Sequence, residues 1–185
     1  MGVNMLLRRS TPLYTELVPT ETANQHIIAS NCNNITSLME FTKKLPPLAL
    51  LIIHLEIDSD NIMALDSLRT DEKFQVITHK PQHGITHAML NTLNKSSMGT
   101  MVYFSGDEVF IWSMVKLAKN SGITDDKIVL NRCGSKRNVY CVHCSTINIA
   151  DYSSIIQCNT CGTSLFVRNH FSRRMGAYLG VRADN

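Results

Sequence analysis

The sequence predicts two parts in one chain: a doubly wound α/β domain built on a parallel sheet, and a small β module that holds a metal ion. Short aliphatic runs alternate with segments of helical spacing between residues 26 and 134. Four cysteines in two Cys-x-x-Cys pairs follow, and a short basic stretch, GSKRN, separates the two patterns. We therefore expect an N-terminal arm (1–25), an α/β domain (26–134) and a C-terminal module (135–185).

Five β-branched or aliphatic runs predict the strands, and four segments of helical spacing lie among them. The expected strands are His26–Ser30, Leu48–Ile57, Phe74–Thr78, Met101–Phe104 and Lys127–Leu130. The expected helices are Ile35–Leu45, Ile62–Arg69, Ile85–Leu93 and Asp107–Ser121. Strands that are apolar throughout indicate burial on both faces, as in a parallel sheet covered by helices. This alternation favours right-handed, doubly wound topology.

The clearest unit is MVYFSGDEVFIWSMVKLAKNSGITDDKIVL. Asp107 and Glu108 stand where a helix N-terminus favours acidic groups. Gly122 occupies the expected position of a left-handed helix end. The apolar face of this helix is expected at Val109, Trp112, Val115 and Leu117.

Composition and charge limit the functional classes. The 185 residues are 44% hydrophobic and 18% charged, which is typical of a folded chain. The formal charge of +3 is too small to indicate nucleic acid by itself. No apolar run is long enough to span a membrane, and the first ten residues lack the order of a signal peptide. We therefore expect a cytoplasmic protein, in which thiols stay reduced.

The turn after the first strand, ASNCNNITS, contains no glycine. A dinucleotide site needs glycines at this turn, because the backbone must approach the pyrophosphate closely. The order of elements and the segment VYFSGDEVFIWSM resemble the pyridine-nucleotide half of ferredoxin-reductase-type flavoenzymes. Those enzymes carry glycines at the first turn and Cys-Gly-Pro-Glu where this chain has Phe104-Ser105-Gly106-Asp107. We expect no bound NAD(P), no flavin site and no catalytic residue, and we interpret Cys32 as a small half-buried residue.

The four paired cysteines predict a tetrathiolate metal site at Cys141, Cys144, Cys158 and Cys161. A Cys-x-x-Cys turn directs two thiolates at one ion, and two such turns complete a tetrahedron. The thirteen intervening residues, STINIADYSSIIQ, are long enough for a β-hairpin, and Gly162 lets the backbone fold around the sulfurs. Two disulfides or a thioredoxin-like redox pair fit the doubled motif less well.

The metal itself is left open by the ligand set, since four thiolates suit Zn(II) and iron alike. Zinc would stabilise a module too small to build its own core, whereas iron would act as a one-electron relay. We favour zinc. His143 is expected on the surface or beside the ligands, because structural zinc sites close at four ligands. The histidines of HKPQHGITH, His79 to His87, form a weaker candidate metal site.

The C-terminal tail carries a cationic cluster interleaved with aromatic residues. Such a cluster suits docking to an acidic protein surface, or contact with nucleic acid. The candidate docking residues are Arg168, His170, Phe171, Arg173, Arg174 and Tyr178.

The motif YCVHC…C..CG..L.VR.HFSRR..AY.GV, from Tyr140 to Val181, resembles the C-terminal signature of DmmA-type subunits of bacterial dimethylamine monooxygenase. The resemblance implies a cytoplasmic heteromer of methylamine metabolism that converts dimethylamine to methylamine and formaldehyde with O2 and NAD(P)H. It places haem on one partner subunit and flavin and iron–sulfur groups on reductase subunits. The expected role of this chain is a structural metal site and a docking surface.

The cysteine quartet and the basic tail also allow two other functions. An electron-relay subunit would hold mononuclear iron between the four cysteines. A nucleic-acid-binding zinc ribbon would use Arg168, Arg173 and Arg174, with salt-sensitive affinity. The small net charge counts against the second, so we expect neither nucleic-acid nor membrane partners.

Overall fold

A computed structural model describes residues 11–32, 35–46, 49–56, 68–69, 72–79 and 84–183. The chain divides into two compact units, one of residues 14–134 and one that includes residues 135–185. We call them the α/β unit and the ribbon module, and we describe each by itself.

The α/β unit is built on a five-stranded sheet in which every pairing is parallel. Its strands are β1 (Gln25–Ser30), β2 (Leu50–Glu56), β3 (Phe74–His79), β4 (Thr100–Gly106) and β5 (Ile128–Arg132). The strand order is β3-β2-β1-β4-β5, so the order reverses between β1 and β4. This is the doubly wound architecture that the sequence predicts.

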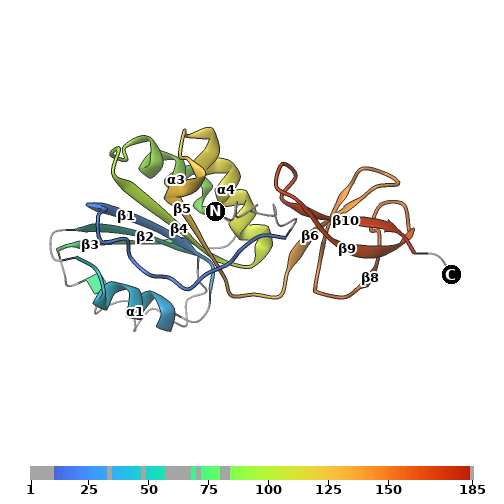
Figure 1. Ribbon diagram of the computed structural model, residues 1–185, viewed down its shortest axis with the longest axis horizontal. Helices are drawn as coiled ribbons and strands as arrows, with labels where there is room; N and C mark the ends of the chain where they lie inside the picture. Colours follow the sequence, from blue (N-terminus) through green and yellow to red (C-terminus); the bar gives the residue numbers. More distant parts are fainter. Residues whose placement is uncertain are drawn as a thin grey trace, which may run out of the picture. The chain divides into compact units, whose positions relative to one another are not determined.

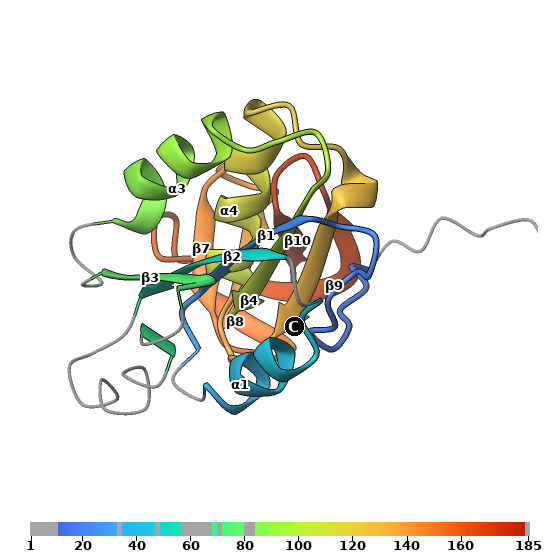
Figure 2. The same cartoon turned by 90° about the vertical axis from the view of Figure 1, so that its left-hand side faces the viewer.

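Helices cover both faces of this sheet, with α1 on one side and α3 and α4 on the other (Figures 1 and 2). They are α1 (Thr36–Lys43), α3 (Ile85–Asn94) and α4 (Glu108–Asn120), and a short 3-10 helix, η2 (Asp125–Lys127), precedes β5. Of the helix expected at Ile62–Arg69, all but Leu68 and Arg69 lies outside the described residues. Those two residues are helical, and Leu68 is buried.

Apolar side chains on both faces of the strands explain why the sheet is covered twice. Under α1, Leu38 and Phe41 pack with Ile28, Ile53 and Tyr103 in one buried cluster. Burial of such apolar surface contributes about 25 cal/mol per Å². This burial is the main favourable contribution to the stability of the sheet.

Helix α4 begins and ends as the sequence predicts. The Asp107 side chain accepts a hydrogen bond from the Phe110 N–H at 2.9 Å, which satisfies one of the free donors of the first turn. Gly122 has φ +85°, the left-handed conformation that ends the helix. The expected apolar face was too narrow: Val109 and Leu117 are only half-buried. The buried residues are Glu108, Phe110, Ile111, Trp112, Met114, Val115 and Ala118.

Residues 14–24, expected as part of an arm, pack on the α/β unit. The Thr15 N–H donates to the Leu130 carbonyl at 2.8 Å, and Leu17 and Ala23 are buried. The Tyr14 hydroxyl donates to Glu108 Oε1 at 2.8 Å. Residues 14–24 therefore belong to the α/β unit, which we expected to begin at residue 26.

The ribbon module is a five-stranded sheet in the order β7-β6-β10-β9-β8. Its strands are β6 (Arg137–Cys141), β7 (Ile147–Ala150), β8 (Ile155–Gln157), β9 (Ser164–Ser172) and β10 (Ala177–Arg182). Only the pair β6–β10 is parallel. The hairpin expected between the two cysteine pairs is wrong, because β7 pairs with β6 and β8 pairs with β9 at opposite edges of the sheet.

Candidate metal centre and the crevice of the parallel sheet

The two Cys-x-x-Cys segments form a repeated turn at two strand ends. β6 ends at Cys141, and Cys158 directly follows β8. In the first turn the Ser145 N–H donates to the Cys141 carbonyl at 2.8 Å, and in the second the Gly162 N–H donates to the Cys158 carbonyl at 2.9 Å. The equivalent hydrogen bond in each segment closes a tight turn that contains both cysteines of the pair.

The residue after each cysteine pair has a left-handed backbone. Gly162 has φ +70°, and Ser145 has φ +62° at the equivalent position. A threonine follows in both cases, and its carbonyl accepts the N–H of the first cysteine, from Cys141 to Thr146 at 2.8 Å and from Cys158 to Thr163 at 3.0 Å. The segments CVHCST and CNTCGT are therefore one turn used twice.

These turns bring the four sulfur atoms together, all within 4.8 Å of one another. Cys141 Sγ lies 3.9 Å from Cys161 Sγ, and Cys144 Sγ lies 3.6 Å from Cys158 Sγ. Four sulfurs bound to zinc at about 2.3 Å would stand about 3.8 Å apart in a tetrahedron. The two separations match this value, and all the sulfurs lie within 4.8 Å of one another, so small shifts of the side chains would bring the quartet around a single tetrahedral ion.

Hydrogen bonds around the quartet favour thiolates at the second turn. The Thr163 hydroxyl, 3.3 Å from Cys161 Sγ, together with its N–H lowers the pKa of Cys161 to about 5. Backbone N–H groups of Cys161 and Thr160 lower the pKa of Cys158, whereas burial raises the pKa of Cys141 to about 11. A metal ion would therefore have to displace a proton from Cys141.

Asn148, which the sequence analysis missed, links the two turns. Its side chain is buried, Oδ1 accepts the Asn159 N–H at 2.8 Å, and Nδ2 lies 3.6 Å from Cys158 Sγ. An asparagine within INIA carries no signal by itself; only the pairing of β7 with β6 brings it inward. His143 is exposed, as expected, and a hydrogen bond from it further lowers the pKa of Cys161.

The candidate docking residues divide by burial. Arg168, His170, Arg173 and Arg174 are exposed. Phe171 and Tyr178 are buried and stack edge to face with ring centroids 5.0 Å apart. These two aromatic residues therefore pack beneath the surface and are not available for contact with a partner.

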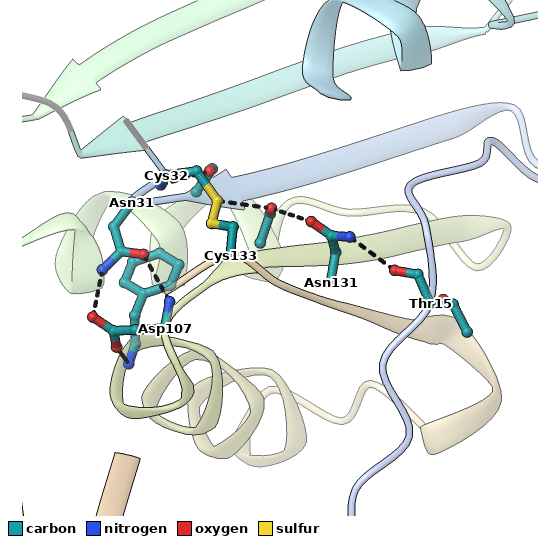
Figure 3. Close-up of a disulfide and its surroundings, with 9 residues drawn as sticks. Thr15, Asn31, Cys32, Asp107, Asn131 and Cys133 are labelled. Atoms are coloured by element: carbon teal, nitrogen blue, oxygen red, sulfur yellow. Dashed lines mark hydrogen bonds between the residues drawn. A yellow bond between two sulfur atoms is a disulfide. The ribbon is translucent and has the colours of Figure 1, made fainter. Parts of the chain in front are cut away.

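In the α/β unit, ligands of doubly wound sheets would bind outside the carboxyl ends of β1 and β4, where the strand order reverses. Side chains fill this crevice. Asn31 Oδ1 accepts the Asp107 N–H at 3.3 Å, and its Nδ2 donates to Asp107 Oδ2 at 3.4 Å (Figure 3). A Cβ added at Gly106 would lie 2.1 Å from Asn31 Oδ1, so glycine here admits the protein's own amide. Asp107 meanwhile caps α4, the helix end that would otherwise face a phosphate.

A disulfide joins Cys32, in this turn, to Cys133 just after β5 (Figure 3). The expectation that both thiols stay reduced is therefore wrong for this pair. No local pattern indicates this pairing, because 101 positions separate the two cysteines. Parallel strands bring their carboxyl ends to one edge of the sheet, and that edge holds both sulfurs.

The two described histidines of HKPQHGITH, His79 and His87, have different surroundings. His54 is fully buried; its Nδ1 lies 3.1 Å from His79 Nε2, and its Nε2 lies 2.8 Å from Thr92 Oγ1. Thr92 donates its own proton to the Ala88 carbonyl, so it accepts from His54. His87 is exposed on α3, and His83 lies outside the described residues. Of the described side chains, only the four cysteines form a group able to hold a metal.

Burial and the neighbouring His79 lower the pKa of His54 to about 4. Burial also lowers the pKa of His79. Both rings are thereby kept neutral at physiological pH, which agrees with a structural pair. In the described part of the chain, no helix is both long and apolar enough to cross a membrane.

Comparison with known proteins places these features in a family. Residues 7–128 match the family described as dimethylamine monooxygenase subunit DmmA-like, N-terminal domain, and residues 138–181 match the corresponding C-terminal domain. A curated relative is the heme-dependent oxidative N-demethylase delta subunit of Ectopseudomonas mendocina (strain ymp). It is 42% identical over 94 residues, which cover 50% of this chain and 54% of the relative.

Two solved structures show a similar arrangement at low identity. Phthalate dioxygenase reductase is 14% identical with a TM-score of 0.49, over 74% of this chain and 46% of that one. The Amycolatopsis cytochrome P450 reductase GcoB is 14% identical with a TM-score of 0.46, over 65% and 42%. The fold itself rests on the strand order and helix placement described above. By the match over most of its length, the chain belongs to the DmmA-like family of dimethylamine monooxygenase subunits.

Proposed function

We propose that this chain is a non-catalytic assembly subunit of a haem-dependent dimethylamine monooxygenase, in which a zinc-stapled ribbon docks on the haem-containing subunit. The complex would use O2, NAD(P)H and a proton to convert dimethylamine to methylamine, formaldehyde and water. Haem would lie on the docking partner, and flavin and iron–sulfur groups on the reductase subunits. The observation that carries this proposal is an apolar face of the ribbon module on which four residues are exposed, Ile147, Ile149, Ile155 and Phe166.

The pairing of strands defines this outer face. Tyr140 on β6 stands opposite Ile147 on β7 and beside Leu179 on β10. On the other half of the sheet, Phe166 on β9 stands opposite both Val181 and Ile155. Directly opposed residues share a face, and alternate residues of one strand share it too. The outer face therefore comprises Tyr140, Ile147, Ile149, Ile155, Phe166, Leu179 and Val181.

The members of the outer face that lie nearest its edges are the most open to solvent. The exposed fractions are 46% for Ile147, 57% for Ile149, 56% for Ile155 and 46% for Phe166. The opposite face holds the buried Cys141 and Leu165, so the sheet has used its other side for the metal site. A contiguous apolar face spanning a whole small sheet is typical of an interaction site.

Charge selects the kind of partner. Residues 135–185 contain six Lys and Arg but only two Asp, a formal charge of +4 within a chain of +3. Arg168 is exposed and stands two residues after Phe166 on β9. Even after four thiolates bind a divalent ion, this module stays cationic. It therefore suits a partner surface with an apolar centre and a carboxylate rim, because complementary charge speeds and orients association.

A zinc ion would supply the stability that the ribbon core lacks. The cluster beneath the sulfurs consists of Leu165 and the cysteines, with Ile156 packed against it. Modules of this size need a staple. Binding free energies of structural zinc reach about 10–16 kcal/mol in small zinc-finger peptides. The metal would thus rigidify the ribbon sheet, and the opposite face of the same sheet would contact the partner.

The α/β unit would contribute packing and no coenzyme. Its crevice is occupied by Asn31, Cys32 and Asp107, and the Asp107 carboxylate would repel a pyrophosphate. NAD(P)H oxidation is accordingly assigned to a reductase subunit. This leaves the unit as a rigid body that carries the ribbon.

The test is assembly of the complex from co-expressed subunits with Phe166→Asp in this chain. We expect the variant to retain its metal and to lose co-purification with the haem-containing subunit, because a buried carboxylate would face apolar groups. Met98→Asp is the matched control, since Met98 is fully exposed on the α/β unit. Assembly unchanged by Phe166→Asp would overturn the docking face.

The identity of the bound metal distinguishes the assembly role from an electron-relay role. A zinc-replete and colourless chain excludes it, whereas stoichiometric iron with a visible thiolate band, bleached on reduction, would favour it. Salt-sensitive binding to DNA or RNA by the isolated full chain would instead support the nucleic-acid alternative.

A further inference from the structure

We propose that Cys32 and Cys133 form a reversible thiol–disulfide exchange site at the edge of the parallel sheet. Their Cα atoms are 6.0 Å apart, within the range that a disulfide spans without backbone movement. The proposed ligands are low-molecular-weight thiols and disulfides, or the dithiol of a reducing protein. This site lies beyond the assembly role and does not depend on it.

The two sulfurs differ in access. Cys133 is exposed, whereas Cys32 is 8% exposed. Exchange requires a thiolate to reach one sulfur of the disulfide, and the more open sulfur is the one it reaches. Cys133 is therefore the point of attack, and Cys32 is the leaving group held inside the protein.

The reduced state already has partners in place for Cys32. Ser105 Oγ lies 3.2 Å from Cys32 Sγ and donates its own proton to Asn131 Oδ1 at 2.7 Å. Asn131 Nδ2 in turn donates to the Thr15 carbonyl at 2.9 Å (Figure 3). A Cys32 thiol can therefore donate to Ser105 Oγ and extend this chain of hydrogen bonds. The Cys32 thiol therefore has a hydrogen-bond acceptor in place when the disulfide is reduced.

The chemistry balances as two exchanges. An external thiolate bonds to Cys133 Sγ, and the Cys32–Cys133 bond breaks to leave a Cys32 thiolate, which takes up a proton. A second external thiolate then attacks the external sulfur of this mixed disulfide and releases Cys133. Two external thiols are oxidised to one disulfide, and the protein gains two electrons and two protons. The reverse sequence, driven by a small disulfide, restores the bond.

Reduction would loosen the segment that leaves the α/β unit. The Cys133 N–H donates to the Gly106 carbonyl at 2.9 Å, and a Cβ at Gly134 would lie 2.7 Å from Asp107 Cβ. The residues that follow, Ser135 and Lys136, are exposed. The disulfide is thus the last covalent tie before the ribbon module, and breaking it leaves that point held by one hydrogen bond and close packing.

The experiment uses the metal-loaded full chain in a series of reduced and oxidised glutathione mixtures, quenched with an alkylating reagent and read by peptide mass spectrometry. We expect Cys32 and Cys133 to gain alkyl groups together, at a half-point within the series, while the four ribbon cysteines stay unmodified. Tryptic cleavage after Lys136 should rise several-fold across the same half-point.

A pair that is alkylated in every mixture, or in none, would overturn the proposal. The variant Cys32→Ser/Cys133→Ser serves as the control, because its cleavage after Lys136 must not respond to the glutathione ratio. A response that persists in this variant would place the redox effect elsewhere and equally contradict the assignment.

Discussion

The α/β unit and the ribbon module both gather cysteines at the end of a sheet, with opposite chemical results. In the α/β unit, Cys32 and Cys133 form a disulfide bond with each other. In the ribbon, four sulfurs stand 3.6–3.9 Å apart in the pairs that approach most closely and leave room for an ion. The surroundings differ likewise, because Asn31 and Asp107 complete each other's hydrogen bonds in the crevice. Side chains that bond to one another fill the crevice of the α/β unit, whereas the four ribbon sulfurs lie where one ion could bind them all.

The largest expected effect is on the ribbon alone. Removal of the metal with a chelator, or Cys158→Ser, should unfold it, because about 10 kcal/mol of folding free energy would come from the ion. Heteronuclear NMR should then lose the dispersed signals of residues 135–183 and keep those of the α/β unit. Thr160→Ala, in the exposed part of the same turn, is the control. Loss of both sets of signals would contradict independent units.

The next effect concerns the cross-link of the α/β unit. Cys32→Ser/Cys133→Ser should lower the free energy of unfolding of this unit by up to about 4 kcal/mol, since the bond closes a loop of 101 residues. Urea titration followed by the single tryptophan, Trp112 on α4, measures it. Metal content should not change. An equal loss of metal would show that the two units share their stability.

Acid should weaken the α/β unit through His54. Its pKa is about 4 in the folded state against 6.5 unfolded, so between these values the unfolded chain binds more protons. Stability is therefore complete above pH 6.5 and falls by at most roughly 3 kcal/mol as the pH drops towards 4. After treatment with a chelator, the free energy of unfolding of the α/β unit, followed by Trp112 fluorescence, should show the same dependence on pH. His54→Gln should reduce this dependence, and His87→Gln, at an exposed residue, should leave it unchanged.

The smallest effect tests the repeated turn. Gly162→Ser should cost about 1 kcal/mol of ribbon stability, because a side chain strains the left-handed backbone. Ser145→Gly should gain about 0.5 kcal/mol, since relief of that strain exceeds the added entropy of the unfolded chain. Thermal unfolding in a zinc buffer compares the two. Effects of the same sign would argue against equivalent turns.

The elements of the α/β unit could be predicted from local signals. Aliphatic runs marked each strand to within two residues, and Asp107 and Gly122 marked both ends of α4. The grouping of the four cysteines was also predictable, because the spacing within each Cys-x-x-Cys pair is local. Relations across the sheet were not: the Cys32–Cys133 bond and the inward position of Asn148 depend on which strands pair.

The expected hairpin failed for the same physical reason. The residues between the cysteine pairs alternate as strands do, yet β7 finds its partner upstream in β6 and β8 finds its own downstream in β9. Burial of Phe171 and Tyr178 likewise follows from the register of β9 against β10. Sequence periodicity indicates a strand and its two faces, whereas the partner decides which face is covered.

Native mass spectrometry of the full chain in the presence of NADPH and zinc tests both halves of the comparison at once. We predict a single species with one zinc ion in place of four thiol protons, two fewer hydrogens at Cys32 and Cys133, and no dinucleotide at millimolar NADPH. A chain without metal would contradict the proposed metal site of the ribbon. A chain that carries a stoichiometric dinucleotide would contradict the proposal that side chains close the crevice of the α/β unit.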